Sequence, residues 1–322
     1  MDSERLSVIF RHLHGNVHNW NIMPGVVAAT NSFRYTLDGP MLSWDQRQFY
    51  EDNGYLIITQ LIEPQLLHEC RERFVDICEG RFPKGEMTLM KDISLLKLGV
   101  SGEFLYNKLQ DIVWDDVLSK YILHDGLLDY VQCFTGPNIM AMHSMLINKP
   151  PDSGKMTSQH PLHQDLHYFA FRPADRIVAS WTAIDRVTVD NGCLEVIPGS
   201  HKGILLRHEY PRWENGVNKA FHGVQGFDHY PRIPLEMEPG DTVFFHPLLI
   251  HGSGVNSTKG FRKAISCHYA DSACEYIEVR GTSQENIANE VSALAKRRGY
   301  DMDFRAFWEF RCRLARGVRL NL

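Results

Sequence analysis

The sequence of 322 residues lacks any run of the ~18 consecutive apolar residues that a membrane span requires. Its densest apolar segment, residues 243–250, is interrupted by His246 and Pro247. Positive charge is not in excess either, because 34 Lys and Arg residues stand against 39 Asp and Glu residues, for a formal net charge of −5. We therefore expect no membrane span, and a nucleic-acid backbone is disfavoured as the main partner.

Cysteine shows neither of the patterns that would define a covalent or metal scaffold. There are seven cysteines, an odd number, with no CxxC pair among them. This argues against a disulfide framework and against a zinc–thiolate site, and it predicts buried thiols in a reducing compartment. Glycine and proline, at 24 and 15 residues, show no period, and 43% of the residues are hydrophobic. The composition is that of a globular protein with a substantial core.

The first 32 residues lack the apolar periodicity of a folded core. Within them, Arg5-Leu6 and His12-Leu13 are separated by five residues, so the two pairs share one face of a short helix. This spacing resembles the amino-terminal type of peroxisomal import signal, although a frayed helix would fit the pattern by chance. We expect residues 1–32 to form a targeting segment and linker, and residues 33–322 to form a single domain.

The next part of the chain carries helix signals. Ser43 and Gln46 form a capping box for a helix that ends at Asn53-Gly54, and Pro64 opens a second helix after a short strand at residues 55–58. The helical character is expected to extend to about residue 136.

After Pro137 the pattern changes to short β-like runs separated by Pro, Gly and Asn, at residues 143–148, 167–171, 177–184, 193–197, 242–245 and 264–269. Such runs predict a β-sandwich or barrel over about residues 137–272. Helical spacing returns at residues 284–314, which are expected to pack outside the sheets.

The segment from His160 to His167 contains the most informative motif. On an extended chain residues i and i+2 face the same way, so His163 and Asp165 can direct a nitrogen and an oxygen at one point. A third ligand is offered by His251, which we place at the end of an apolar strand in front of two glycines. Two His and one carboxylate on one face of an octahedron are typical of non-haem Fe(II) oxygenases, although zinc accepts the same donors.

Arg262 follows His251 by eleven residues and is placed near the start of the next strand. Its planar guanidinium can bind the far carboxylate of a dicarboxylate that chelates the metal by its other end, and Ser253 can add a hydroxyl donor. This feature favours iron and a dicarboxylate cosubstrate over zinc.

An HxD motif, a distant His and a following Arg are together similar to the Fe(II)/2-oxoglutarate-dependent dioxygenases. Longer segments resemble, in order and spacing, the peroxisomal phytanoyl-CoA 2-hydroxylase family, and the likeness runs from about Phe33 to the end of the chain. These segments are residues 134–140, 148–154, 160–169, 190–201 and 240–254. The resemblance implies a mainly β fold with flanking helices around a double-stranded β-helix, also called a cupin-like jelly roll.

The resemblance also implies a set of site residues and cofactors. Fe(II) would be bound by His163, Asp165 and His251. The cosubstrate 2-oxoglutarate would contact Arg262 and Ser253 at its distal carboxylate, and its pocket would be lined by Lys108, Met145 and Trp181. O₂ and ascorbate, as reductant, complete the cofactor set.

The implied reaction is 2-hydroxylation of a 3-methyl-branched fatty acyl-CoA, which opens fatty-acid α-oxidation. The family carries an amino-terminal peroxisomal signal near its start. The resemblance therefore supports import of this chain into the peroxisomal matrix through a receptor that binds residues 5–13. The carboxyl end, Arg-Leu-Asn-Leu, is not a second peroxisomal signal.

Three other functions remain open on the sequence: a dioxygenase for another acid, a metallohydrolase, and a non-catalytic binder of acyl-CoA or protein. Release of succinate would separate the dioxygenases from the other two. Trp181 could be only a core aromatic residue, Met145 only a gap filler, and Arg262 part of a solvated rim. The remaining histidines near the motif or on neighbouring strands are expected to make core hydrogen bonds or to support the metal ligands: His160, His167, His222, His246 and His268. Lys149, Lys155 or Lys202 could meet the CoA phosphates.

Overall fold

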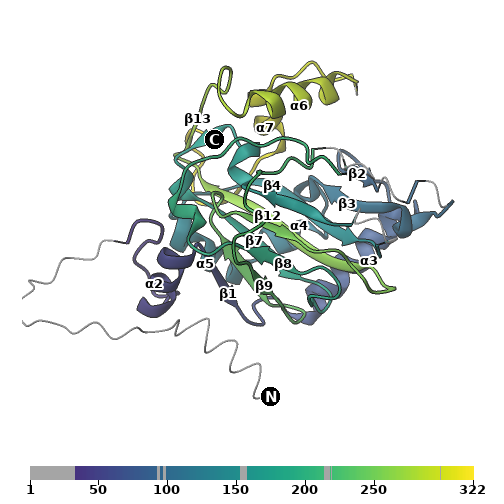
Figure 1. Ribbon diagram of the computed structural model, residues 1–322, viewed down its shortest axis with the longest axis horizontal. Helices are drawn as coiled ribbons and strands as arrows, with labels where there is room; N and C mark the ends of the chain where they lie inside the picture. Colours follow the sequence, from purple (N-terminus) through teal and green to yellow (C-terminus); the bar gives the residue numbers. More distant parts are fainter. Residues whose placement is uncertain are drawn as a thin grey trace, which may run out of the picture.

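The computed structural model describes residues 33–92, 95–96, 99–152, 158–213, 218, 220–297 and 299–322. The import signal expected at residues 5–13 lies outside this range. The described chain has a β core with helices against one side and over one end (Figure 1). Among these residues, none of the helices combines the length and the apolar character needed to cross a bilayer.

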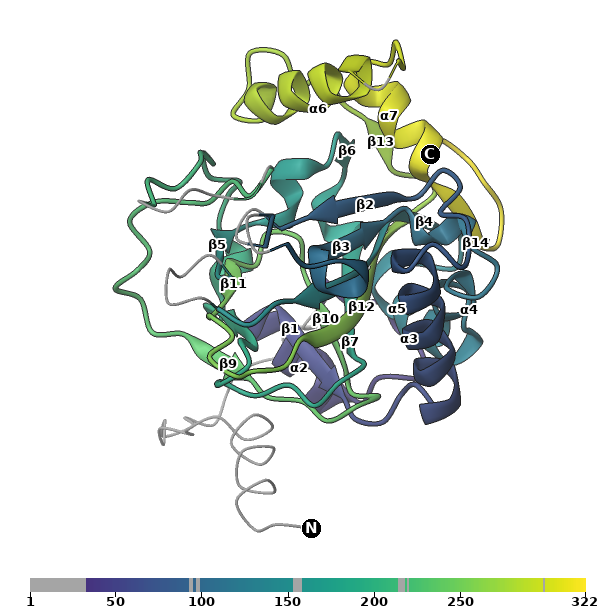
Figure 2. The same ribbon diagram turned by 90° about the vertical axis from the view of Figure 1, so that its right-hand side faces the viewer.

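The helices before residue 136 begin where the sequence predicts. Helix α2 (Trp44–Asn53) has the full capping box between Ser43 and Gln46, and it ends at Gly54 with a left-handed φ of 81°. Helix α3 (Pro64–Cys78) begins at its proline. Helices α4 (Ser119–Ile122) and α5 (Asp125–Thr135) follow, and α5 packs against the large sheet. Figure 2 shows α3, α4 and α5 on one side of the β core.

The large sheet is antiparallel and has eight strands. Seven form one path in the order β1 (Tyr55–Ile58), β10 (Thr242–Phe245), β7 (Ile177–Ala183), β12 (Arg262–Asp271), β4 (Ile139–Lys149), β3 (Tyr106–Gln110) and β2 (Thr88–Lys91), and β14 (Arg313–Arg316) pairs with β4. The long strands β4 and β12 lie at its centre and pair over ten register positions.

The second sheet has four short strands in the order β5 (His160–His163), β11 (His251–Ser253), β8 (Leu194–Val196) and β9 (Ile233–Leu235), and a separate pair is formed by β6 (Phe171–Arg172) and β13 (Glu275–Tyr276). Side chains from both main sheets share one core cluster, in which Val196 of β8 packs with Trp181 of β7 and Phe245 of β10. Two facing antiparallel sheets with an apolar interior confirm the expected jelly roll.

Short 3₁₀ helices occupy several connections: η1 (Gly102–Leu105), η2 (Ile112–Trp114), η3 (Asp165–Tyr168), η4 (Ala174–Arg176) and η5 (Ser200–Lys202). Helices α6 (Glu285–Arg297) and α7 (Phe304–Arg311) then lie over one end of the β core, as both ribbon views show (Figures 1 and 2). Trp308 of α7 and Ile287 of α6 are almost completely buried and belong to a core cluster with Phe169 and Phe171. This cluster anchors the two helices to the sheets.

The expectation of helical structure up to about residue 136 was incomplete, because β2 and β3 lie there and extend the large sheet. In β3 Asn107 and Leu109 are almost fully buried, while Lys108 and Gln110, which are half-buried on the other face, line a cavity. A strand whose second face is polar for functional reasons lacks the apolar alternation that identifies strands in a sequence.

Candidate active site

Three potential metal ligands come from two paired strands of the small sheet and from the 3₁₀ helix that follows one of them. His163 is the last residue of β5, Asp165 is the first residue of η3, and His251 is the first residue of β11. Strands β5 and β11 pair so that His251 lies directly opposite His163. Two sequence interpretations need correction: Asp165 lies just past the strand rather than on it, and His251 opens a new strand. Pro247 and the turn around it separate His251 from β10.

The three side chains converge. One ligand atom from each of His163, Asp165 and His251 lies within 4.8 Å of the others, and all three residues are buried. The Asp165 carboxylate is 3.3 Å from Nε2 of His163 and 3.7 Å from Nε2 of His251. In both histidines Nδ1 faces a backbone carbonyl, that of Pro161 at 2.9 Å and that of Leu249 at 3.0 Å.

These backbone contacts set the tautomers. Because a carbonyl can only accept, Nδ1 of each ring carries the proton, and Nε2 presents a lone pair toward Asp165. Burial lowers the pKa of His251 to about 4, which keeps that ring neutral. Two lone pairs and a carboxylate that point at one another in a buried site fit a divalent cation, with the residues His163, Asp165 and His251 as its holders.

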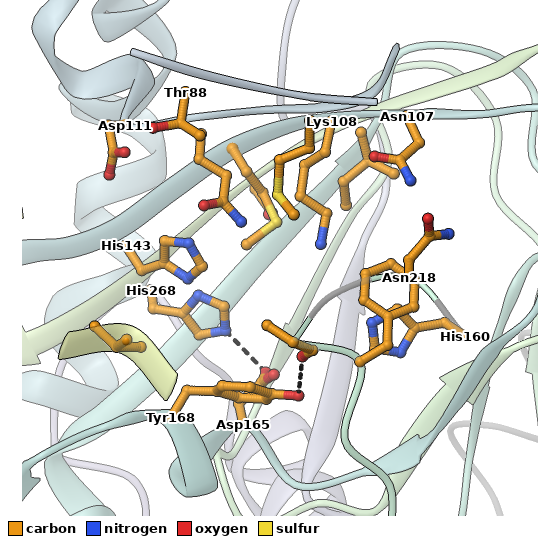
Figure 3. A pocket seen from close by; sticks show the side chains of 18 of the residues that line it. Thr88, Asn107, Lys108, Asp111, His143, His160, Asp165, Tyr168, Asn218 and His268 are labelled. Carbon is orange, nitrogen blue, oxygen red and sulfur yellow. Dashed lines mark hydrogen bonds and ion pairs between the residues drawn. The ribbon is translucent and has the colours of Figure 1, made fainter. Parts of the chain in front are cut away.

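A fourth histidine orients the carboxylate. Nε2–H of His268, in β12, donates to Asp165 at 2.8 Å, and His143, in β4, stacks on the His268 ring with the centroids 5.7 Å apart. Figure 3 shows this donation and the two stacked rings at the cavity wall. Burial alone would raise the pKa of Asp165, but the facing histidines and their hydrogen bonds hold that pKa well below its ordinary value.

The ligands open onto a cavity of about 540 Å³ that runs along the inside of the large sheet. The register of β4 and β12 arranges its wall in layers: Arg262 lies opposite Lys149, Ala264 opposite Ile147, Ser266 opposite Met145, and His268 opposite His143. Alternate residues of a strand face the same side, so each layer adds to one wall, and the long side chains of its end layer reach back toward the ligands, as Lys149 does to Ser253 at 2.8 Å. The Arg262 layer is one end of this wall, and the His268 layer lies beside the three ligands.

All eight residues singled out in the sequence line this cavity. Arg262 is only 2% exposed, its guanidinium lies over the Trp181 ring at 5.2 Å, and it donates to the carbonyl of Gly192 at 2.6 Å. Its Nε has no hydrogen-bond partner among the described residues. An arginine buried at this depth is not part of a solvated rim, and its open donor faces the interior.

Lys108 and Met145 lie in the middle layers of the wall. Lys108 is opposite Ile147, and Met145 is opposite both Ser266 and Gln110. The Lys108 ammonium points into the cavity (Figure 3) and lies 4.9 Å from the Phe221 ring centroid. Burial lowers the pKa of Lys108 to about 8. A second basic side chain therefore faces the same cavity as Arg262 and the three converging residues.

Comparison with known proteins places this site in a family. Residues 50–264 match the family described as Phytanoyl-CoA dioxygenase (PhyH), a range that includes the three converging ligands and Arg262. The chain belongs to the phytanoyl-CoA dioxygenase family.

Curated members of the phytanoyl-CoA dioxygenase family match over most of their length. The rat protein named "Phytanoyl-CoA dioxygenase, peroxisomal" is 55% identical over 295 residues, which cover 90% of this chain and 87% of the rat protein. The bovine protein of the same name is 49% identical over 331 residues, which cover 99% and 98%. A "Probable phytanoyl-CoA dioxygenase" of Caenorhabditis elegans is 54% identical, with 89% and 97% covered.

Solved structures support the same fold for this phytanoyl-CoA dioxygenase family member. EctD from S. alaskensis, solved with 2-oxoglutarate and 5-hydroxyectoine, has a TM-score of 0.57 at 17% identity and covers 76% of this chain and 82% of its own. The epimerase SnoN, in complex with Fe³⁺, alpha ketoglutarate and nogalamycin RO, has a TM-score of 0.56 at 18% identity, with 72% and 84% covered. Both likenesses concern the fold.

Two neighbours of the site were only partly identified from the sequence. The sequence analysis expected His268 either to make core hydrogen bonds or to support the metal ligands, and the structure shows the second, because His268 donates directly to Asp165. Lys149 was considered for CoA phosphates, but it is 5% exposed and its Nζ donates to Ser253 Oγ at 2.8 Å, inside the cavity. The only signal for either is cross-strand register between residues more than a hundred positions apart, which a single sequence does not show. The other motif histidines make internal contacts, as His167 does with His222 at 3.0 Å.

Proposed function

We propose that this protein is an Fe(II)- and 2-oxoglutarate-dependent dioxygenase that hydroxylates carbon 2 of 3-methyl-branched fatty acyl-CoA, such as phytanoyl-CoA. The observation that carries the proposal is one cavity in which His163, Asp165 and His251 converge and a buried Arg262 closes the far end. The substrate class is supported by relatives at 49–55% identity that are named phytanoyl-CoA dioxygenase.

Each side chain at the metal site has a separate role. His163, Asp165 and His251 would hold the ion and leave the remaining coordination positions open, while His268 keeps the carboxylate turned toward them. When bound, Fe(II) supplies O₂ activation coupled to decarboxylation of 2-oxoglutarate to succinate and CO₂.

The cosubstrate would be held by residues of the strand wall. Arg262 and Ser253 would bind its distal carboxylate, Trp181 and Met145 would form apolar sides, and Lys108 would face it from β3. Burial of this end excludes bulk water, which strengthens the ion pair and fixes the direction in which the dicarboxylate can lie.

The proposal includes location. Relatives from rat, mouse and human are named peroxisomal, and Arg5-Leu6 and His12-Leu13 have the spacing of an amino-terminal import signal. Residues 1–32 then serve as targeting segment and linker for an import receptor, residues 33–322 act as a single catalytic domain, and the product enters fatty-acid α-oxidation. Ascorbate would act as the reductant that keeps the iron ferrous.

The test is succinate formation by the purified protein with Fe(II), ascorbate and 2-oxoglutarate. Turnover is compared with phytanoyl-CoA, with a straight-chain acyl-CoA and without substrate. We expect strong stimulation by the branched ester only. Stimulation by another acid alone would assign a different dioxygenase substrate, and no consumption of 2-oxoglutarate under any condition would contradict the enzyme and favour a binding function.

A further inference from the structure

The cavity continues past the metal ligands on the side away from Arg262. We propose that this continuation, under α6 and α7, is the channel that binds the acyl chain of the substrate, an inference that rests on the proposed function. Its inner wall is made by His143 of β4 and by Trp308 and Phe307 of α7. Trp308 lies edge-on to His143 at 5.8 Å and to Phe169 at 5.3 Å.

Helix α6 forms the outer wall with one apolar face. Ile287, Val291 and Leu294 all line the cavity, and their spacing of four and three residues places them on the same side of a helix. Ile287 is 1% exposed, whereas Ala293, on the opposite side of the helix, is exposed. At the outer end Tyr300 donates a hydrogen bond to Glu86 at 3.2 Å, which ties the segment after α6 to the segment before β2.

The apolar lining of the inner part assigns it to a hydrocarbon chain rather than to CoA. The buried charges nearest to it, Arg311 and Asp111, are paired with each other, and the exposed Arg297 lines the cavity only from the last turn of α6. The opposite end is occupied by the cosubstrate when Arg262 binds it. A substrate with carbon 2 at the metal then finds the apolar wall for its chain on the α6 side of the cavity. Each buried methylene contributes about fourfold to affinity, so binding here would favour long chains.

The experiment compares Leu294→Trp, which fills the channel, with Ala293→Trp, which adds the same side chain to the exposed face of the same helix. KM and kcat are measured with phytanoyl-CoA and with 3-methylbutanoyl-CoA. Binding of both esters to the Mn(II)-loaded protein is measured by equilibrium dialysis. Leu294→Trp is expected to weaken the binding of phytanoyl-CoA about tenfold or more, and the binding of the short ester less than about twofold. Ala293→Trp is expected to change neither, and Val291→Phe serves as a second filling variant if Leu294→Trp does not fold.

An unchanged preference for chain length in both filling variants would overturn the channel. Equal weakening of short and long esters would also overturn it, because that result indicates general damage to the site. Failure of the proposed function is distinguishable: the wild-type protein would then produce no succinate with either ester. The dialysis measurement would still report whether a long acyl chain binds under α6.

A different observation, at the opposite end, carries a second inference: we infer that Lys149 is a second cationic contact for the distal carboxylate of 2-oxoglutarate. Lys149 is the last residue of β4 and lies opposite Arg262 in the register with β12. Its Nζ donates to the Ser158 carbonyl at 2.6 Å and to Ser253 Oγ at 2.8 Å. An ammonium has three donors, so one remains for a ligand beside Ser253.

Two buried basic side chains that lack a direct ion pair favour an anionic ligand between them. Neither Lys149 nor Arg262 forms an ion pair with a carboxylate of the described chain, although both are at most 5% exposed. Gly192 fits between them, since a Cβ at that position would lie 2.4 Å from Cε of Lys149 and its carbonyl accepts from Arg262. Leaving like charges buried and unpaired is costly, and a bound carboxylate between them removes the cost.

The test is direct binding to the Mn(II)-loaded protein by titration calorimetry, with Lys149→Met against Lys202→Met, an exposed lysine that pairs with Asp52. The ligands are 2-oxoglutarate and 2-oxovalerate, which lacks the distal carboxylate. Lys149→Met is expected to weaken the binding of 2-oxoglutarate about tenfold or more and to leave the affinity for 2-oxovalerate unchanged. An equal loss of affinity for both ligands, or no loss for either, would contradict the contact. The control variant Lys202→Met is expected to bind both ligands as the wild type does.

Discussion

The two ends of the cavity are built from different parts of the chain. The closed end, with Arg262 and Lys149, is made by neighbouring strands whose register fixes the distance between the two cations. The other end is covered by α6 and α7, which follow the β core in the sequence and are held to it by the cluster around Trp308. Paired strands hold their side chains more rigidly than a covering helix does. The closed end is therefore suited to binding one fixed cosubstrate, and the helical end to accommodating the shape of a particular substrate.

The ends also differ in electrostatics. At the closed end two basic side chains, Lys149 and Arg262, form no ion pair in the described chain, whereas Arg311 and Asp111 at the helical end pair with each other. The closed end therefore favours an anionic ligand, and the apolar wall of the helical end does not. The metal ligands stand between them, and the predictions below test whether the two ends act separately.

The largest effect is expected from Asp165→Ala. This variant removes a metal ligand that lies between the two ends of the cavity, so both ends lose the metal. We expect at least about a thousandfold loss of succinate formation and loss of tight Mn(II) binding, measured by electron paramagnetic resonance. The matched control is His160→Gln: the His160 ring lies 4.4 Å from the His163 ring without belonging to the converging set, so this variant should retain the metal. Loss of metal in His160→Gln but not in Asp165→Ala would contradict the assignment.

Arg262→Met should act only on the closed end. We expect about a hundredfold weaker 2-oxoglutarate binding with unchanged affinity for phytanoyl-CoA, measured by calorimetry and dialysis. Because Lys149 and Arg262 would share one carboxylate, the double variant Arg262→Met/Lys149→Met should lose less than the product of the two single losses. Strictly multiplicative losses would show that the two cations bind independently.

His268→Leu should weaken metal binding without changing the residues at either end of the cavity. It removes the donor to Asp165, and the loss of such an orienting hydrogen bond is expected to weaken Mn(II) binding about 10- to 100-fold. His143→Leu is the control, since that ring stacks on His268 and its Nε2 makes no hydrogen bond within the described chain. Equal effects of both variants would indicate a packing role for the pair.

Lys108→Met should give the smallest change and affect stability. Burial lowers the pKa of Lys108 to about 8, so the unfolded chain binds this proton more tightly than the folded protein does. The charge therefore destabilises the protein fully below pH 8, and the penalty fades as the pH rises toward the unfolded value near 10.4.

We expect Lys108→Met to raise the free energy of unfolding of the metal-free protein by about 1–2 kcal/mol at pH 7, and the gain to shrink between pH 8 and 10. Urea denaturation across this range measures it. A gain that grows with pH would have the wrong sign and would assign Lys108 a stabilising partner.

Local signals in the sequence were sufficient for part of this structure. The capping box at Ser43, the proline at the start of α3 and the apolar strand β10 depend on residues that are neighbours in the chain. The HxD motif and the Arg that follows His251 could be found for the same reason, because their spacing is short. The strand β3 was missed because its cavity face carries Lys108 and Gln110 for the site rather than for the core.

The remaining features depend on pairing between distant strands. Lys149 faces Arg262, and His268 reaches Asp165, only because β4, β12 and the small sheet assemble as they do. The apolar face of α6 is visible in the sequence as an amphipathic helix, but its position over the cavity is set by Trp308 and its neighbours. Tertiary register, which a single sequence does not encode in a readable form, decides these contacts.

The most direct test of the two-ended cavity is a crystal structure of the protein grown without oxygen, with Mn(II), 2-oxoglutarate and a 3-methyl-branched acyl-CoA. We predict the distal carboxylate between Arg262 and Lys149, the metal on His163, Asp165 and His251, and the acyl chain under α6 beside Leu294. A dicarboxylate bound away from Arg262, or an acyl chain that leaves the metal along β5 and β11, would contradict it.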